Sequence, residues 1–391
     1  MTGRPLRIAI VAGEESGDLL GADLVKAIET ATGRPVELTG VGGAHLQALG
    51  LKTLFDPGEI SLMGIAAVVT RLPQLYRRIG QAATAVVAAR PDCLVTIDVP
   101  DFSLRVARKV RAAAPGLPTV HYVCPSVWAW RPERAVRMAS FVDHVLCLLP
   151  FEVGELSRLR GPSATYVGHR LVHEPRLIAA ARAQRAKPPR QPGEPTTLLV
   201  LPGSRRGEVS RLLGPFRETV DLLAARGTQP RVLLPTVPHV EAMVRARTVD
   251  WPVKPTILTT ADEKYRAFGE ADAALAASGT VTLELALGRV PTIACYKADP
   301  LMRAVYSMIG IWSASLPNLV ADSPVVPEFY DHFVRPGMLA RLLEQLLSDT
   351  HTRAAQLAGF DRIAAVMATD RPSGAIAADA VLATIDRRQN D

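Results

Sequence analysis

Small residues separate an apolar run from a helical pattern in the segment AASGTVTLELALGRV, where Ser278, Gly279 and Thr280 precede a helix that carries Glu284. The first N–H groups of a helix have no partner inside it, and the helix dipole adds partial positive charge at the same end. Such a turn suits an anion, and a phosphate is the obvious candidate. An ordinary strand-to-helix turn with Ser or Thr as its N-cap explains the same fragment.

A second segment, LPGSRRGEV, ends an apolar run at Gly203 and Ser204 and continues into Arg205 and Arg206. Guanidinium groups at a strand end, facing the turn at Ser278, would neutralise a diphosphate without a metal. The sequence contains no Asp-x-Asp pair, which argues against a nucleotide held through a divalent cation. We therefore expect neither a metal nor a cofactor.

The segment TIDVPDF places Asp98 at the carboxyl end of another apolar run and Asp101 shortly after it. Asp101 is best explained as the N-cap of the next helix. Asp98 has no such local role, and a carboxylate in a partly dry cleft can have a raised pKa and act as a general base. Asp98 is therefore the candidate base.

Two further segments each allow two interpretations. In VAGEESGDLLGADL, which lacks the glycine patterns of nucleotide loops, Glu14, Glu15 and Asp18 either cap a helix or contact the hydroxyls of a sugar. In HYVCPSVWAWRPERAVRM, arginines at helical spacing follow two tryptophans, and they form either a solvated face or a phosphate site beside an apolar wall. These arginines are Arg131, Arg134 and Arg137.

All these segments follow strand-like apolar runs that alternate with helical patterns, over residues 6–169 and again from residue 196. Such runs indicate parallel sheets covered on both faces, whose ligands bind at the carboxyl ends of the strands. The predicted fold class is α/β, with two doubly wound Rossmann-like domains that face each other across a cleft. We expect a first domain over residues 1–175, a linker over 176–195, a second domain over 196–350 and C-terminal helices over 351–391.

The composition fits a globular chain, since 48% of the 391 residues are hydrophobic and 21% are charged. The net charge of +7 is modest and spread along the chain, so nucleic acid is not an expected partner. The four cysteines form no Cys-x-x-Cys pair and are expected to be buried thiols. The longest apolar run is about half of a membrane span. Residues 1–7 lack a signal-peptide pattern, so we expect a cytoplasmic location.

Taken together, the segments resemble those of lipid-A-disaccharide synthases, which are bacterial glycosyltransferases of GT-B type. The resemblance covers nearly the whole chain. It is carried by AGEESGD (12–18), LMGIAAV (62–68), IDVPDF (97–102), HYVCPSVWAWR (121–131), LPFE (149–152), VGH (167–169), LPGSR (201–205), ASGTVTLE (277–284) and SLPNLVA (315–321).

The resemblance implies a hexosyltransferase of lipid A biosynthesis that transfers 2,3-diacylglucosamine from its UDP donor to 2,3-diacylglucosamine 1-phosphate. The products would be UDP and a β-1',6-linked disaccharide 1-phosphate, formed with inversion at the anomeric carbon. A single displacement of this kind needs a base for the acceptor 6-hydroxyl, and Asp98 matches the family's candidate base.

The resemblance also implies two sets of binding residues. The donor-side set comprises Gly203, Ser204, Arg205, Ser278, Gly279, Thr280, Glu284, Asn318 and Glu328, with Glu284 placed to reach the ribose hydroxyls. The acceptor-side set comprises Glu14, Ser16, Asp18, Trp128 and Arg131.

The chain departs from the family pattern at Asp331, where glutamine is usual, and at Arg170 and His173, where proline and aspartate are usual. A carboxylate near the phosphates of UDP would be unfavourable unless it were paired. The donor-side set therefore does not include Asp331.

Both implied substrates carry acyl chains, so the apolar run at residues 60–69 with its basic flank predicts peripheral contact with the inner membrane. Residues 300–312 allow the same interpretation, and burial in the core is the alternative for both segments. By family analogy the C-terminal helices pack on the first domain, of the same chain or of a partner in a homodimer. The residues expected at the acyl or membrane contact are Leu62, Met63, Ile65, Val68 and Val69.

Other functions remain compatible with this architecture because a fold does not fix an activity. A UDP-sugar 2-epimerase or another sugar transferase would share the domains, but it would not need a surface for acyl chains. A two-domain sugar-binding protein would have a cleft but no placed base. A peripheral membrane scaffold would explain the apolar segments and nothing else.

Overall fold

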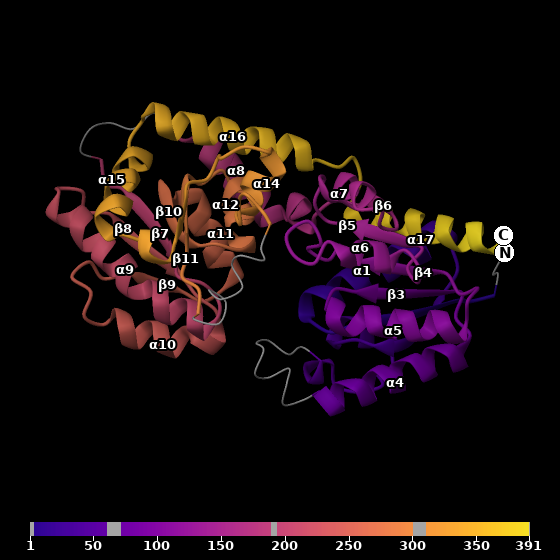
Figure 1. Ribbon diagram of the computed structural model, residues 1–391. Coiled ribbons are helices and arrows are strands. Elements are labelled where there is room, and N and C mark those ends of the chain that lie inside the picture. Colours follow the sequence, from indigo (N-terminus) through magenta and orange to yellow (C-terminus); the bar gives the residue numbers. More distant parts are fainter. Residues whose placement is uncertain (1–3, 61–71, 189–193, 300–309, 391) are drawn as a thin grey trace. The chain divides into compact units, whose positions relative to one another are not determined.

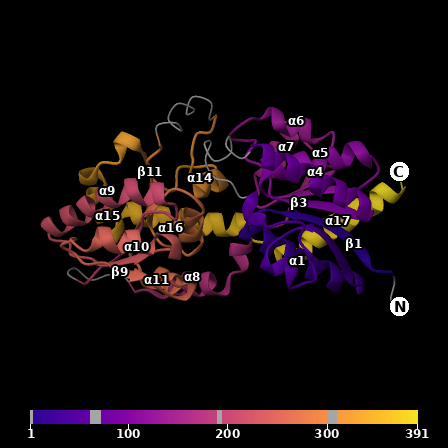
Figure 2. The ribbon, with the colours of Figure 1, turned by 90° about the horizontal axis from the view of Figure 1, so that it is seen from below.

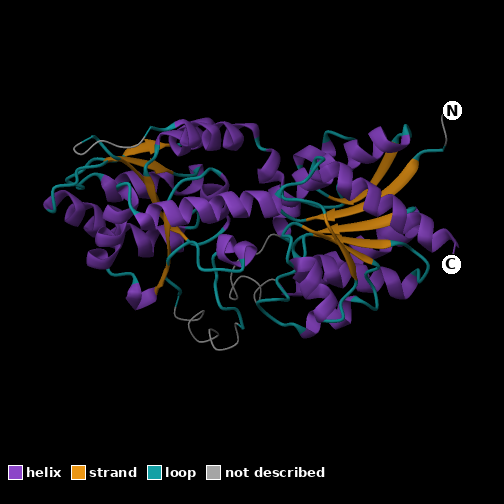
Figure 3. Cartoon of the chain, turned by 90° about the horizontal axis from the view of Figure 1, so that it is seen from above, coloured by secondary structure: helices purple, strands orange, loops and turns teal. Residues whose placement is uncertain are grey.

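The computed structural model describes residues 4–60, 72–188, 194–299 and 310–390, and the chain divides into two compact units (Figure 1). One unit comprises Met1–His169 with Thr369–Asp391, and the other comprises Arg170–Ala368. Each contains a six-stranded parallel sheet enclosed between helices (Figure 3). The prediction of two doubly wound α/β domains is confirmed.

The first unit is built on strands that lie, in order across the sheet, as β2 (Val36–Val41), β1 (Leu6–Ala12), β3 (Cys93–Ile97), β4 (Thr119–Tyr122), β5 (His144–Cys147) and β6 (Ser163–Tyr166). Its helices are α1 (Glu15–Thr32), α2 (Ala44–Gln47), η1 (Pro57–Glu59), α4 (Leu72–Ala89), α5 (Pro100–Ala113), α6 (Glu133–Met138), α7 (Glu152–Arg158) and α17 (Ser373–Asn390). The chain passes from β1 to β2 on one side and then to β3 on the other. The switch point, where such sheets bind ligands, therefore lies between β1 and β3.

Two cores cover the faces of this sheet because successive side chains of a strand point in opposite directions. Leu94 of β3 packs with residues of α4 and α5. Its neighbour Val95 packs on the other face with residues of α1 and α17, which lie side by side (Figure 2). The loops after β1 and β3 thus project from a sheet that is fixed on both faces.

The second unit repeats this plan with strands in the order β12 (Glu328–Tyr330), β11 (Thr292–Tyr296), β10 (Ala273–Ala277), β7 (Thr197–Leu201), β8 (Arg231–Pro235) and β9 (Thr256–Leu258). Its helices are η2 (Arg170–His173), α8 (Pro175–Ala186), α9 (Arg206–Ala225), α10 (Pro238–Thr248), α11 (Ala261–Glu270), α12 (Thr280–Leu287), α14 (Leu316–Ala321), η4 (Asp331–Phe333), α15 (Pro336–Leu347) and α16 (His351–Met367). Here the switch point lies between β7 and β10, so the loops after these two strands are the ones placed to bind a ligand.

The observed boundaries differ from the expected domain organisation at two places. The expected linker begins with helix α8, whose Gln184 amide donates to the carbonyls of Phe268 and Ala271 at 2.6 and 2.7 Å. The C-terminal helices also separate, because α16 belongs to the second unit, where Gln356 accepts the Thr292 N–H at 2.7 Å, and α17 belongs to the first. Pro372 stands between them and interrupts the helical pattern.

The four cysteines are free and buried, as the sequence predicts. Among the described residues, no helix has the length and apolar character needed to cross a membrane. The predicted acyl contact at Leu62, Met63, Ile65, Val68 and Val69 lies outside the described residues, as do residues 300–309.

Candidate functional site

Asp98 follows β3 in a strained turn at the switch point of the first sheet. Both Asp98 and Val99 have left-handed backbone conformations, with φ of 51° and 42°. Such conformations cost about 1–3 kcal/mol each for residues other than glycine and persist only where the surroundings enforce them. The Asp98 N–H donates to the carbonyl of Tyr122 at 3.0 Å, and the Ser103 hydroxyl donates to the Asp98 carbonyl at 2.5 Å. The turn is therefore held from β4 and from α5.

The carboxyl group of Asp98 has the properties of a general base. Burial raises its pKa, and the Val99 N–H, which donates to Oδ1 at 2.8 Å, opposes that shift. No described residue donates a hydrogen bond to Oδ2. This oxygen is available to take a proton from a hydroxyl group within reach.

Asp101 is not the N-cap of α5, so that prediction is wrong. The N-cap position is Val99, because Pro100 begins the helix. Asp101 lies in the first turn and pairs with Arg134 of α6 at 2.7 Å.

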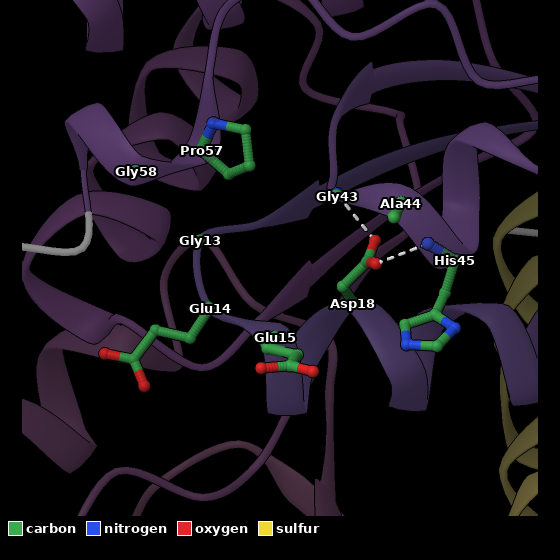
Figure 4. Close-up of a pocket in the computed structure, with 9 residues that line it drawn as sticks. All are labelled: Gly13, Glu14, Glu15, Asp18, Gly43, Ala44, His45, Pro57 and Gly58. Carbon is green, nitrogen blue, oxygen red and sulfur yellow. Dashed lines mark hydrogen bonds between the residues drawn. The ribbon is translucent and has the colours of Figure 1, made fainter. Parts of the chain in front are cut away.

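The loop after β1 lies against this turn. A Cβ atom on Gly13 would lie 2.9 Å from Cγ2 of Val99, so only glycine allows the approach. Glu14 occupies the N-cap position of α1, but its side chain makes no capping hydrogen bond. The capping interpretation therefore does not hold for Glu14. Glu14 and Glu15 instead line a pocket of about 480 Å³ (Figure 4).

Asp18 is part of the wall of this pocket, and its carboxylate is already engaged by backbone N–H groups. It is 2% exposed, and its carboxylate accepts the N–H groups of Gly43 at 2.6 Å and His45 at 2.8 Å (Figure 4). These are the first amides of α2, so Asp18 caps a helix other than its own. Ser16 is exposed and is not among the residues that line the pocket.

The pocket suits a neutral polar ligand because the described residues that line it include carboxylates and no lysine or arginine. Hydroxyl groups can donate to Glu14 and Glu15, whereas an anion would be repelled. The sequence analysis missed the far wall, although the glycines after β2 mark a third loop at the carboxyl edge of the sheet. That wall consists of Gly43, Ala44, His45, Pro57 and Gly58.

Trp128 and Arg131 lie in the loop after β4 and line neither this pocket nor the pocket of the second unit described below. The Trp128 indole donates to Glu152 at 3.3 Å and packs edge-on against Phe151. Arg131 precedes α6, has φ of 54° and stacks on Trp130. The spacing predicts that Arg131, Arg134 and Arg137 share one helical face, and this is wrong. Arg131 has a left-handed backbone and lies before α6, which carries the other two arginines.

Three buried side chains of this unit have the chemistry of metal ligands. The ligand atoms of Cys124, Cys147 and Glu152 lie within 4.8 Å of one another. The contact with Cys147 and burial both raise the pKa of the Cys124 thiol, and the Glu152 oxygens already accept N–H groups. The cluster therefore favours a neutral hydrogen-bonded arrangement over a cation.

In the second unit, the turn after β10 begins α12 without a side-chain cap. Its N-cap is Gly279, with φ of 156°, and Thr280 is the first helical residue. The alternative of a Ser or Thr N-cap is therefore wrong. The prediction that the Ser278 N–H has no partner is wrong, because this group donates to the Cys295 carbonyl at 2.8 Å and continues the sheet. The N–H groups of Gly279 and Thr280 donate to no described residue.

The loop after β7 lies beside this turn and completes a pocket of about 360 Å³. Gly203 has φ of 110°, and a Cβ atom there would lie 2.6 Å from Glu208. Glu208 accepts the N–H groups of Ser204 and Arg205 at 3.3 Å each, and it also pairs with the Arg205 guanidinium at 3.3 Å. With 60% of its side chain exposed, Arg205 is weakly held and can turn toward a ligand.

Glu284 and Lys264 form an ion pair at 2.5 Å, and both line this pocket. Lys264 comes from α11 and also lies over the ring of Tyr265. Sequence reasoning missed Lys264 because it reads as an ordinary charged position of an amphipathic helix. Only the packing of α11 brings it to the switch point.

Asn318 and Glu328 do not line the pocket but support it from behind. The Asn318 amide donates to the Val326 carbonyl at 2.9 Å and to Glu328 at 2.7 Å. Glu328 also accepts the Ala314 N–H at 3.1 Å, and the Ala314 carbonyl receives the Ser278 hydroxyl at 3.4 Å. The two residues therefore fix the segment on which Ser278 rests.

The three departures from the family pattern lie in short 3-10 helices. Asp331 has φ of 47°, and its carboxylate accepts the Ala298 N–H at 3.0 Å. Arg170 and His173 belong to η2, which packs on α8 and α12. None of the three lines a described pocket.

A family model and similar curated sequences identify the same family for this chain. A family model described as lipid-A-disaccharide synthetase matches residues 8–373. The lipid-A-disaccharide synthase of Rhodopseudomonas palustris strain HaA2 is 49% identical over 385 residues, which covers 97% of each chain. That of Rhodospirillum centenum is 41% identical over 387 residues, covering 98% of this chain and 96% of the relative.

Solved structures with low sequence identity share the architecture. A glycosyltransferase of kitacinnamycin has a TM-score of 0.63 at 16% identity, covering 99% of this chain and 100% of that chain. A putative UDP-N-acetylglucosamine 2-epimerase from Listeria monocytogenes has a TM-score of 0.59 at 14% identity, covering 99% and 97%. At these identities the likeness shows the GT-B fold alone.

Proposed function

The chain belongs to the lipid-A-disaccharide synthase family, as a hexosyltransferase of lipid A biosynthesis, and from this premise we propose its substrates and mechanism. The donor is UDP-2,3-diacylglucosamine and the acceptor is 2,3-diacylglucosamine 1-phosphate. The products are UDP and the β-1',6-linked disaccharide 1-phosphate. The proposal rests mainly on two features. The second unit has an uncapped helix start at Gly279 with Arg205 nearby, and the first unit has a half-buried Asp98 in a strained turn.

The diphosphate of the donor binds at the start of α12. The N–H groups of Gly279 and Thr280 donate to its oxygens, and Arg205 turns from Glu208 to the same charge. As the bond to the sugar breaks, negative charge grows on the departing UDP. Donors already aimed at that position stabilise the transition state without reorganisation.

Glu284 accepts hydrogen bonds from the ribose hydroxyls. Its partner Lys264 balances the charge of the carboxylate, which reduces the repulsion between Glu284 and the nearby diphosphate. The donor pocket thereby combines an anion site with a site for neutral hydroxyls.

Asp98 takes the proton from the acceptor 6-hydroxyl. The 6-oxygen then forms its bond to the anomeric carbon while the bond from that carbon to the UDP oxygen breaks. Attack opposite the leaving group inverts the anomeric centre. The hydroxyl groups of the acceptor sugar lie at the pocket of Glu14 and Glu15, which is adjacent to the Asp98 turn through Gly13. The 1-phosphate, which these carboxylates would repel, lies outside this pocket.

The acyl chains of both substrates are the reason to propose a cytoplasmic enzyme that contacts the inner membrane through residues 62–69. This part of the proposal rests on the apolar sequence alone. A homodimer is proposed on family analogy only.

The experiment is incubation of the purified protein with both diacylated substrates, followed by mass spectrometry of the lipid product and assay of released UDP. Formation of the disaccharide 1-phosphate together with UDP supports the proposal. Absence of both products refutes it, and conversion of UDP-N-acetylglucosamine to its 2-epimer would establish the epimerase alternative instead.

A further inference from the structure

A buried carboxyl group that the proposed mechanism does not use lies behind the loop after β4. Glu152 is the first residue of α7 and is 4% exposed. Its Oε2 accepts the N–H groups of Leu148 and Leu149 at 3.1 and 3.0 Å, and its Oε1 accepts the indole N–H of Trp128 at 3.3 Å. The carboxylate thus joins the end of β5 to a loop that follows β4.

That loop is connected to the turn of the candidate base. It begins after Tyr122, whose carbonyl accepts the Asp98 N–H, and it leads into α6, whose Arg134 pairs with Asp101. Cys124 and Val127 of the loop are buried in the core. The indole of Trp128 contacts the start of α7, through Glu152 and through the ring of Phe151 at 5.2 Å.

We infer that Glu152 is a positioning residue, which holds the Trp128 loop in the conformation that the acceptor requires beside Asp98. The inference rests on the proposed function for the identity of the acceptor. The contact itself concerns only the first unit and does not depend on that function.

The protonation state of Glu152 should control this contact. Burial raises the pKa of Glu152 to about 7, against the opposing effect of its three N–H donors. An ionised carboxylate accepts all three donors, whereas a protonated one presents a hydrogen to one of them. Because the two backbone donors are fixed, the indole is the one that moves away as the pH falls through 7.

Among the described residues, the titratable groups that face Glu152 include Cys124 after β4, Cys147 of β5 and Tyr166 of β6. Burial and the charge of Glu152 raise the pKa of Tyr166 to about 12. The raised pKa values of Cys124 and Tyr166 keep these two groups neutral around pH 7, so they do not account for a change in this range.

The first test measures Trp128 in the free protein. The difference in fluorescence between wild type and Trp128→Phe, recorded from pH 5.5 to 8.5, should change with a midpoint near 7. The change should vanish in Glu152→Gln, which presents an amide N–H to the indole, and persist in Glu155→Gln, a control on the same helix that pairs only with Arg158 among the described residues. A flat difference signal in the wild type would overturn the inference.

The second test is a double-mutant cycle on turnover. Glu152→Gln should raise the acceptor KM about fivefold to tenfold, the effect of one lost hydrogen bond, and leave the affinity for UDP unchanged. In a Trp128→Phe background the same substitution should change the acceptor KM little. An equal penalty in both backgrounds would show that Glu152 acts independently of Trp128 and overturn the inference. If the wild type forms no disaccharide, the proposed function fails, and the fluorescence measurement still decides whether Glu152 holds the loop.

Discussion

Gly13 packs so closely on Val99 that a Cβ atom on Gly13 would lie 2.9 Å from the Val99 Cγ2 atom. The relationship joins the loop after β1, which carries Glu14 and Glu15, to the left-handed turn that carries Asp98. This contact therefore links the proposed base to the proposed acceptor pocket at the same edge of the sheet.

Gly13→Ala should disturb this contact. The added methyl group must displace Val99 or Ile60, and overpacking of this kind costs about 1–3 kcal/mol of unfolding free energy. We expect lower turnover with unchanged UDP affinity, measured by product formation and by calorimetry. Gly80→Ala is the matched control, because a methyl group there meets open space in a helix and should leave both unchanged. Full turnover by Gly13→Ala would show that the contact between Gly13 and Val99 does not determine the position of Asp98.

Thr280→Pro tests the bare amides of α12 directly. Proline is accepted at the first helical position and removes the N–H group, which is a proposed phosphate donor, together with the threonine hydroxyl, for which Thr280→Ala is the control. The Kd for UDP should rise by about tenfold or more, as expected for a lost hydrogen bond to a charged group, and binding of uridine should stay the same. Thr280→Ala keeps the N–H group and should bind UDP as the wild type does. Equal UDP affinity of the proline and alanine variants would contradict the anion site.

Lys264→Met should weaken UDP binding by about tenfold, because it leaves the Glu284 carboxylate without its partner at 2.5 Å and close to the diphosphate. Titration calorimetry at two salt concentrations measures this. Lys254→Met removes the same charge from an exposed position outside the pocket and serves as control. A loss of affinity that is equal in both variants would reflect net charge rather than the ion pair.

His121 should make the protein less stable in mild acid. Burial lowers its pKa to about 3, helped by the charge of Arg134, so the folded state leaves it neutral where the unfolded state binds a proton. The stability is fully present above pH 6.5 and is lost, by about 1.4 kcal/mol per pH unit, as the pH falls from 6.5 toward 3.

Urea denaturation at pH 5 and pH 7.5 measures this dependence. Glu152, whose pKa is raised, contributes the opposite slope between pH 4.5 and 7, so the informative quantity is the difference between variant and wild type. His121→Gln should reduce the loss of stability at pH 5, and His351→Gln at an exposed position should not. Equal losses in the wild type and His121→Gln would refute the assignment.

The sequence predicted the parts of the fold that local patterns determine. Apolar runs ending in small or acidic residues located the loops after β1, β3, β7 and β10, and these loops line the pockets or carry the strained turn. The uncapped start of α12 does not follow from local sequence alone, because Ser278 or Thr280 could also cap the helix and the structure places Gly279 at the N-cap.

The remaining site features depend on contacts between distant segments. The sequence pattern of Asp18 fits a ligand, but its carboxylate caps α2, and the role of Lys264 depends on its ion pair with Glu284 of α12. Asn318 lies in a segment near the pocket, but its side chain bonds to Glu328 and Val326 and does not line the pocket. No local pattern distinguishes a side chain that lines a pocket from one that supports it.

The most direct test of the mechanism is the turnover of Asp98→Asn, measured as disaccharide 1-phosphate formed per enzyme with both diacylated substrates saturating. The amide keeps the shape of the side chain but cannot take the proton of the 6-hydroxyl. We expect kcat to fall by about 10²-fold to 10⁴-fold while the Kd for UDP stays at its wild-type value. An unchanged kcat in Asp98→Asn would show that Asp98 is not the base.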